Sequence, residues 1–451
     1  MAGVLANPHG KALWIGYLYW STATQPPELG YSVFETIIAQ AFPQYALRPI
    51  SWNAEKLDVE LCALLANVHN AASFVSLRRT LDRLGVRSPG QRVPIIGCGP
   101  AMLNPGPVLH LLDHVCTSEA EVISALAIVL GNTPRTWVYP KLLVAKNESF
   151  INIMPVTSCR YACRFCAVPR HYPTGMQHAP VEELATLADF TDRRPWVFQA
   201  ASILQYSHFL EMVDIVASQD RTVYVGSMNL NELTAAKAVA LRRIGARHTT
   251  ALWRGDSAPD LVFGLETGSA RVWRSMQKPL SQRTVADGLK LIKNARYSSV
   301  GFYMITGYWL TDQDDIKETV AFLRETLTAF NGDLRIRLTF APFLPVLGTP
   351  DAVRPARHWE ECVAEYDTIA GQLKGICETE MIGSEWYHLL SLVLSRGDTR
   401  YHSVVDDLAR HDPENIADVR ATIDIALSTA GLPCIEDHMA YNNGLHSGER
   451  V

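Results

Sequence analysis

Three cysteines packed into eight residues are the strongest chemical signal in this sequence. Cys159, Cys163 and Cys166 form a C-x₃-C-x₂-C triplet. Three thiolates at this spacing suit an iron–sulfur cluster better than a tetrahedral zinc ion, which takes four protein ligands. A four-iron cluster held by three cysteines leaves one iron open for another ligand. The alternatives are three incidental core cysteines, or a partial zinc site with a distant fourth ligand.

The residues around this triplet indicate where it lies in the fold. The apolar run 150–156 predicts a buried strand, so the cysteines follow in the loop that leaves it. A β/α barrel builds its active site from such loops. With Phe165 before its last cysteine, the triplet resembles the signature of the radical S-adenosylmethionine (SAM) superfamily. The resemblance implies that Cys159, Cys163 and Cys166 hold a 4Fe–4S cluster, whose fourth iron binds the amino and carboxylate groups of SAM.

Strand and helix patterns alternate after the cysteines, as a barrel requires. Further strands are predicted at 196–200, 223–227, 261–266, 300–305 and 334–340. Together with the strand before the cysteines they make six β/α units, and so resemble the partial (β/α)6 barrel of this superfamily.

A second motif follows the fourth of these strands. Residues 264–269 read Gly-Leu-Glu-Thr-Gly-Ser and resemble the family's G-x-E-x-G-S element. The resemblance implies that Glu266 accepts hydrogen bonds from the ribose hydroxyls of SAM, with Gly264 and Ser269 beside it. The alternative is that Glu266 caps a helix. Lys278-Pro279 matches another family feature that has no evident chemical role. Residues 199–202 replace the family's Gly-Gly-Glu, which leaves the contact to the methionyl amine unassigned.

The first part of the chain, residues 12–133, also alternates between strands and helices. We expect strands at 12–19, 46–50, 72–77, 93–99 and 114–116, with helices at 30–42, 57–69, 79–84 and 119–130. This order predicts a parallel, doubly wound sheet of the flavodoxin or Rossmann type, with ligands at the carboxyl ends of its strands.

A Gly/Pro-rich turn in this region carries a second resemblance. Residues 98–107 read Cys-Gly-Pro-Ala-Met-Leu-Asn-Pro-Gly-Pro and resemble an element of cobalamin-binding domains. Glycine there lets the backbone approach a large planar ligand closely. The loop 21–30 contains no histidine, so we expect no histidine ligand on the lower face of cobalamin. An ordinary flavodoxin-like domain is the alternative. The predicted cobalamin contacts are Gly99, Pro100, Asn104 and Ser76.

Composition and domain order narrow the class of protein. The chain has 451 residues, 48% apolar and 19% charged, and its net charge of −5 with no basic run gives no sign of nucleic-acid binding. The start does not resemble a signal peptide, and no apolar run is long enough for a membrane span, so we expect a cytoplasmic protein.

The predicted parts are a cobalamin-binding domain at 1–133, a linker at 134–147, the barrel at 148–351 and a mainly helical C-terminal region at 352–451.

Taken together, the resemblances predict a cobalamin-dependent (class B) radical SAM enzyme. We expect a methyltransferase that moves a methyl group from SAM via cobalamin to an unactivated carbon or phosphorus of a small-molecule or peptide substrate. An external donor of the flavodoxin or ferredoxin type would supply electrons. Among Tyr303, Tyr308, Arg170, His171 and His388, the sequence alone selects no general acid or base.

Four alternatives remain at this stage. Methyl transfer through cobalamin can proceed without radical cleavage of SAM, and the same scaffold can rearrange or couple its substrate without methylating it. Methylthiotransfer is the third, because Cys62, Cys98 and Cys116 form a loose trio that a second cluster would need. The fourth is a non-catalytic cobalamin or redox sensor.

Overall fold

The computed structural model describes residues 13–19, 29–57, 61–87, 92–146, 149–171, 175–188, 193–219, 221–411 and 418–440. The chain divides into two compact units. The first combines Met1–Pro140 with Ser384–Val451, and the second is Lys141–Gly383. The second unit is therefore inserted into the sequence of the first.

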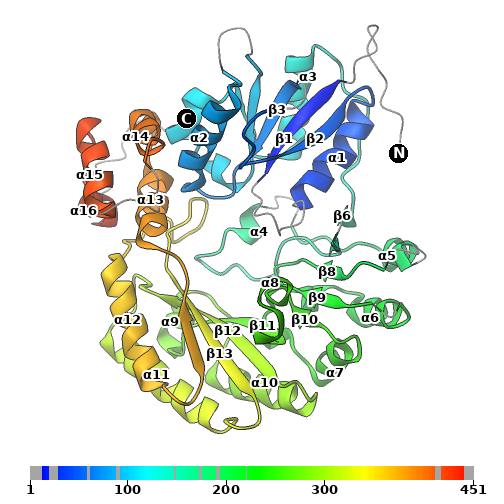
Figure 1. Ribbon diagram of the computed structural model, residues 1–451. Coiled ribbons are helices and arrows are strands. Elements are labelled where there is room, and N and C mark those ends of the chain that lie inside the picture. Colours follow the sequence, from blue (N-terminus) through cyan, green and yellow to red (C-terminus); the bar gives the residue numbers. More distant parts are fainter. Residues whose placement is uncertain are drawn as a thin grey trace. The chain divides into compact units, whose positions relative to one another are not determined.

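The first unit contains a five-stranded parallel sheet in the order β2-β1-β3-β4-β5 (Figure 1). This is the flavodoxin-like order, in which ligands bind where the strand order reverses, beside β1 and β3. The predicted flavodoxin or Rossmann type is confirmed. The strands are β1 (Trp14–Tyr19), β2 (Ala46–Ser51), β3 (Leu61–Asn67), β4 (Ile95–Cys98) and β5 (His114–Val115).

The third strand is not where the sequence places it. Residues 61–67, predicted as helix within 57–69, form β3, and residues 72–77, predicted as strand, belong to α2 (Ser73–Leu84). The segment 61–67 is rich in Leu and Ala, which favour helices, but it is buried on both faces, where a continuous apolar run also fits a strand. In α2, Phe74, Leu77, Leu81 and Leu84 are buried at helical spacing, and this was the available signal.

Helices and turns complete the first unit. α1 packs against β2 and α3, and α14 packs against α2 and the turn η2. The segments are α1 (Leu29–Ala41), η1 (Pro100–Leu103), η2 (Gly106–Leu111), α3 (Glu119–Leu130), α13 (Glu385–Arg396), η6 (Thr399–Tyr401), α14 (His402–Leu408), α15 (Val419–Thr429) and α16 (Ile435–Ala440).

The second unit forms the predicted β/α barrel (Figure 1). Strands β7 to β10 pair in parallel order, as do β11 to β14, and a bridge between Met228 and Phe263 joins the two sets. All six predicted strands are present. The structure adds β6, β10 and β14, and β6 runs antiparallel to β7. The strands are β6 (Leu143–Lys146), β7 (Ile151–Met154), β8 (Trp196–Phe198), β9 (Val223–Val225), β10 (Arg247–His248), β11 (Leu261–Glu266), β12 (Ser299–Thr306), β13 (Arg335–Pro342) and β14 (Glu378–Met381).

Helices cover one face of the barrel strands and leave the other as an inner face. Alternate residues of β12 and β13, such as Phe302 and Leu338, share one hydrophobic core with Leu289 of α10 and Leu323 of α11. Because side chains alternate along a strand, the intervening residues point inward. The helices and turns are α4 (Val168–His171), α5 (Val181–Ala188), η3 (Ile203–Gln205), α6 (Phe209–Ala217), η4 (Leu230–Glu232), α7 (Ala235–Arg243), α8 (Ala251–Arg254), η5 (Gly255–Ser257), α9 (Ala270–Ser275), α10 (Gln282–Asn294), α11 (Gln313–Thr328) and α12 (Trp359–Gln372).

The C-terminal region predicted at 352–451 is not one body. Its first part, with α12 and β14, completes the barrel unit, because β14 pairs in parallel with β13. Residues 384–451 belong to the first unit. A short strand such as β14, which reads Glu-Thr-Glu-Met, gives no apolar pattern from which to predict it.

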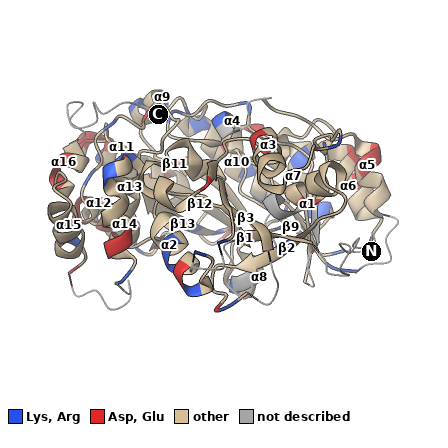
Figure 2. Ribbon diagram, turned by 90° about the horizontal axis from the view of Figure 1, so that it is seen from above, with Lys and Arg blue, Asp and Glu red and all other residues tan. Residues whose placement is uncertain are grey.

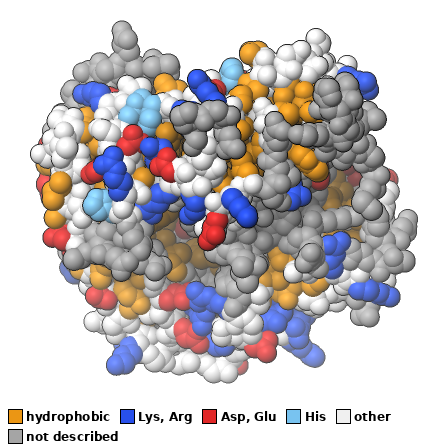
Figure 3. Space-filling model, turned by 45° about the horizontal axis from the view of Figure 1, so that its top comes forward, with side chains coloured by type: hydrophobic (Ala, Val, Ile, Leu, Met, Phe, Trp, Pro, Cys, Tyr) orange, Lys and Arg blue, Asp and Glu red, His pale blue; other side chains and the backbone are white. Residues whose placement is uncertain are grey.

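Charged side chains of both signs are spread over the surface. Figure 2 shows Lys and Arg on the same elements as Asp and Glu, and on the face in Figure 3 the two signs lie side by side. Within the part of the chain that the structure describes, no helix has the length and apolarity that crossing a membrane requires.

Candidate functional site

The cysteine loop leaves the carboxyl end of β7, as predicted. Ser158 opens it with a φ of 61°, a left-handed conformation that turns the chain sharply before Cys159. The amide of Cys166 donates to the carbonyl oxygen of Cys163 at 3.1 Å. Arg170 donates from Nη1 to the carbonyl oxygens of Cys166 (2.7 Å) and Cys163 (3.3 Å). Arg170, a candidate acid or base in the sequence, thus holds the shape of this loop.

Burial raises the pKa of two of the free thiols in this loop. It raises the pKa of Cys163 to about 11, although the charge of Lys278 acts against the rise. Burial also raises the pKa of Cys166. A cluster binds thiolates, so its assembly here would release the protons of these thiols. Among the described residues, no three His, Cys, Asp or Glu side chains are placed to hold a single metal ion.

Two amide side chains face Cys159, the first cysteine of the triplet. Gln205 donates from Nε2 to Cys159 Sγ at 3.5 Å, and Asn229 donates from Nδ2 to the same sulfur at 3.8 Å. They stand just after β8 and β9, so the loops of three successive strands meet at Cys159. Hydrogen bonds to cluster sulfurs tune reduction potential, which makes Gln205 and Asn229 part of the candidate site. Neither residue was predicted from the sequence, although each follows a predicted strand, and this position was the available signal.

Glu266 ends β11 in a strained and buried position. Its φ is 71°, a conformation that costs a non-glycine residue roughly 1–3 kcal/mol. The residue is 8% exposed, and its Oε1 accepts a 2.8 Å hydrogen bond from Lys278 Nζ. A Cβ atom on Gly264 would lie 2.5 Å from that oxygen, so glycine is needed there to make room. Backbone strain of this kind is characteristic of binding sites.

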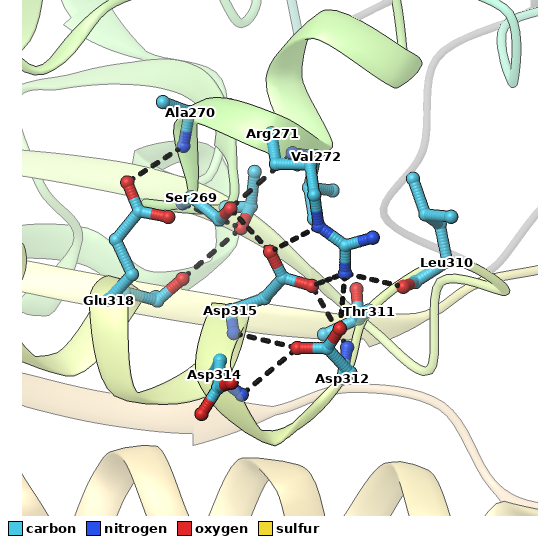
Figure 4. Close-up of polar contacts among 12 residues, drawn as sticks. Ser269, Ala270, Arg271, Val272, Leu310, Thr311, Asp312, Asp314, Asp315 and Glu318 are labelled. Carbon is cyan, nitrogen blue, oxygen red and sulfur yellow. Dashed lines mark hydrogen bonds and ion pairs between the residues drawn. The ribbon is translucent and has the colours of Figure 1, made fainter.

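Ser269 serves the fold in this structure. It is fully buried and caps α9 by accepting from the amide of Val272, and it donates to Asp315 Oδ1 at 2.7 Å. Figure 4 shows Ser269, Arg271 and Asp312 gathered around Asp315. Burial alone would raise the pKa of Asp315, but hydrogen bonds from Arg271, the Asp312 amide and Ser269 lower it. The predicted contact of Ser269 with SAM stays a prediction.

A row of polar side chains begins beside Glu266 and crosses the inner face. The strand register aligns Gly264, Tyr303, Thr339 and Glu380 on β11 to β14. Thr339 Oγ1 donates to Glu380 Oε1 at 2.9 Å, and Arg254 Nη1 donates to Oε2 at 2.7 Å. Burial alone would raise the pKa of Glu380, but these two hydrogen bonds lower it. The inner face therefore offers hydroxyls and a neutralised ion pair to a ligand.

His248 lies next to this row as a neutral imidazole. It is 2% exposed, and burial lowers its pKa to about 4. Nδ1 lies 2.9 Å from Thr250 Oγ1 and 3.3 Å from the Thr250 amide nitrogen, and Nε2 lies 3.4 Å from Ser227 Oγ. Burial raises the pKa of Tyr303, and a hydrogen bond with Ser227 acts in the opposite direction. Tyr303, Ser227 and His248 thus form a connected polar group on the inner face.

The contacts of the remaining described acid–base candidates support the fold. Tyr308 donates to Asp351 Oδ2 at 2.7 Å, and burial raises its pKa to about 12. Asp351 also accepts from Arg164 of the cysteine loop at 2.9 Å, so Tyr308 helps to hold that loop. His388 is buried within α13 of the first unit. The side chain of His171 lies outside the described residues.

The predicted cobalamin turn in the first unit is held by the protein itself. Gly99 has a φ of 96°, and a Cβ atom there would lie 2.4 Å from Asn67 Oδ1 and 2.7 Å from the carbonyl oxygen of Val68. Pro100 begins η1. Asn104 donates from Nδ2 to the carbonyl oxygens of Ser395 (3.1 Å) and Gly397 (2.8 Å). Gly99 therefore permits the ends of β3 and β4 to approach.

Ser76 does not lie at a strand end. It stands within α2, where its carbonyl oxygen accepts from Thr80 Oγ1 at 2.9 Å. The error follows from the misplaced third strand, whose true carboxyl end presents Asn67. Asn67 was not predicted as a site residue for the same reason. The loop 21–28, which lacks histidine, lies outside the described residues.

The loose cysteine trio is not a cluster site. Cys62 is the second residue of β3, whereas Cys98, the last residue of β4, pairs with Asn67 at the other end of that strand. Asn67 follows Cys62 by five residue steps along the strand, a span of about 16 Å. Cys116 follows β5 at the same edge as Cys98, and burial raises its pKa to about 11. Methylthiotransfer, which would need these three thiols together, loses its support.

Comparison with solved structures identifies the fold. No protein-family profile matches the sequence, and no curated protein does. The cobalamin-dependent SAM radical enzyme OxsB, solved with aqua-cobalamin and SAM bound, is similar with a TM-score of 0.54 and 10% identity. OxsB with aqua-cobalamin alone gives 0.53, also at 10% identity. Each match covers 80% of this chain and 56% of OxsB, so the chain corresponds to little more than half of that enzyme.

Proposed function

We propose that this chain is a cobalamin-dependent radical SAM enzyme that transfers a methyl group from SAM to an unactivated carbon or phosphorus centre. The cysteine loop carries the proposal: three thiols follow β7 of a β/α barrel, and Lys278 and Glu266 lie close to them in the same unit. The similarity in fold to OxsB, whose structure holds cobalamin and SAM, supports both cofactors.

The residues present fit the cluster and SAM. Cys159, Cys163 and Cys166 would hold a 4Fe–4S cluster, with Gln205 and Asn229 as amide donors beside one thiolate. When bound, the cluster, SAM and cobalamin supply one-electron chemistry and a carrier for the methyl group. The protein would bind and orient these groups and the substrate, and would exclude water from the site.

Glu266 would accept hydrogen bonds from the ribose. A carboxylate has lone pairs on both oxygens, and Lys278 binds Oε1, so Oε2 can accept a hydrogen bond from a ribose hydroxyl. The strained backbone at Glu266 fixes the direction in which this carboxylate points. The position lies at the carboxyl end of a barrel strand, where such sites are built.

The polar row would face the substrate. Tyr303, Thr339 and Glu380 suit a small molecule or peptide group that donates and accepts hydrogen bonds. Tyr303 is the residue best placed to hold or move a proton there, because Ser227 and His248 support its hydroxyl. We expect the enzyme to work in the cytoplasm with an external donor of the flavodoxin or ferredoxin type.

Anaerobic reconstitution tests the proposal. After reconstitution, each chain should contain about four irons, about four sulfides and one corrin. Incubation with SAM that carries a deuterated methyl group should then transfer the label to a substrate pool of small metabolites and peptides. Four irons without corrin would contradict the cobalamin part, and SAM cleavage without label transfer would favour rearrangement or coupling. The Cys434→Ala variant, altered at an exposed cysteine, is the matched control.

A further inference from the structure

Lys278 is a buried cation whose role the sequence left open. It is 8% exposed and follows α9 through a tight turn in which Gln277 has a φ of 53°. Its amide donates to the carbonyl oxygen of Trp273 at 3.0 Å, which anchors the backbone. The Nζ atom donates to Glu266 Oε1 at 2.8 Å. A lysine is rarely buried unless it is paired, and here its partner is the predicted ribose ligand.

The same turn is joined to the cysteine loop. Arg164 donates its amide hydrogen to the carbonyl oxygen of Met276 at 2.9 Å. Phe165, which precedes the last cysteine, packs against the small hydrophobic cluster that contains Met276 and Tyr308. The cysteine loop and the turn with Lys278 therefore form one connected piece of structure.

Charges near Lys278 keep it protonated. Burial pushes the pKa of Lys278 down, but the carboxylate of Glu266 raises it further, so the net shift is upward. A full positive charge thus lies against Glu266, two residues after Met276, whose carbonyl oxygen accepts from the amide of Arg164 next to Cys163.

We propose that Lys278 is a positioning residue that holds Glu266 in its strained orientation and places a fixed positive charge beside the cluster, so that the cluster is easier to reduce. This inference rests on the proposed function. Reduction adds one negative charge to a cluster, and a buried cation stabilises that charge strongly because water does not screen it. Removing the cation should make the midpoint potential more negative. Removing the opposing carboxylate should make it more positive.

A redox titration of the reconstituted protein, followed by EPR without SAM, tests these signs. Lys278→Met should shift the midpoint potential to more negative values, and Glu266→Gln should shift it to more positive values. Lys278→Arg keeps the charge and should stay close to the wild type. Lys290→Met, at an exposed lysine on α10, is the control and should leave the potential unchanged.

The outcomes separate the two proposals. A wild-type chain that assembles no four-iron cluster would overturn the proposed function, and this inference with it. A wild type with its cluster, and Lys278→Met at the same potential, would overturn the inference alone. If Lys278→Met fails to hold a cluster, Glu266→Gln decides: a positive shift supports the role of charge, and an unchanged potential refutes it.

Discussion

The side-chain amide of Asn104 donates a 2.8 Å hydrogen bond to the carbonyl oxygen of Gly397, 293 positions later in the chain. A second bond reaches the carbonyl oxygen of Ser395. Gly106 adds to this contact, because a Cβ atom there would lie 2.8 Å from Cα of Asp398. The segment 395–398 thus fastens the predicted cobalamin turn within the first unit.

Asn104→Ala should therefore destabilise the protein. The change removes two hydrogen bonds and leaves two partly buried carbonyl oxygens without their donor, a cost of about 1–3 kcal/mol. Urea unfolding measures this loss, and Asn331→Ala, at an exposed turn, should cost much less. A variant as stable as the wild type would show that the contact is dispensable.

Cys163→Ala should abolish the cluster. With one of three ligands gone, iron content after reconstitution should fall from about four per chain to near zero, with loss of the visible absorption of the cluster. Colorimetric assays of iron and sulfide measure this loss of the cluster. Cys434→Ala should retain full iron content, and equal loss in both variants would point to general misfolding instead.

Glu266→Gln should weaken SAM binding. An amide forms weaker hydrogen bonds to the ribose hydroxyls than a carboxylate, and hydrogen bonds to charged groups contribute about 1.5–3 kcal/mol, so affinity should fall roughly 10- to 100-fold. Isothermal titration of the reconstituted protein with SAM gives the dissociation constant. Glu325→Gln, on the exposed side of α11, should bind SAM like the wild type, and unchanged affinity for Glu266→Gln would reject its role.

Acid should destabilise the barrel through His248. Its folded pKa of about 4 lies below the ordinary value of 6.5, so the unfolded state binds more protons between these values. Stability is thus fully present above pH 6.5 and is lost as the pH falls toward 4, by about 3 kcal/mol. Urea unfolding at pH 7 and pH 4 should show a smaller difference for His248→Gln than for the wild type. His208→Gln, at an exposed histidine, should keep the wild-type difference.

Ser269→Ala should loosen the start of α9. The variant loses the helix cap and the hydrogen bond to Asp315, which together contribute about 1–3 kcal/mol. A drop in thermal midpoint checks this. Ser281→Ala removes the cap of α10 and an exposed contact with Thr284 Oγ1 but no bond to a buried carboxylate, so its smaller loss brackets the Asp315 contact. Similar losses in the two variants would argue against a special role for that contact.

Long apolar strands and local motifs could be predicted from the sequence. The triplet at 159–166 and the strand before it lie where expected, because a buried strand and a fixed spacing are local signals. β3 was missed because Leu and Ala favour helices and only packing on both faces of the sheet makes them a strand. Tyr303, Thr339 and Glu380 are far apart in sequence, and only strand register aligns them.

The insertion of the barrel into the first unit has a consequence for biosynthesis. Domains fold as their residues leave the ribosome, and the barrel unit, Lys141–Gly383, is continuous in sequence. The sheet that precedes it emerges first, yet the partners of Asn104 are made only after the whole barrel. The turn at 99–107 can therefore be fastened only after residues 395–397 have been made, and a chain whose synthesis stops within the barrel lacks this contact.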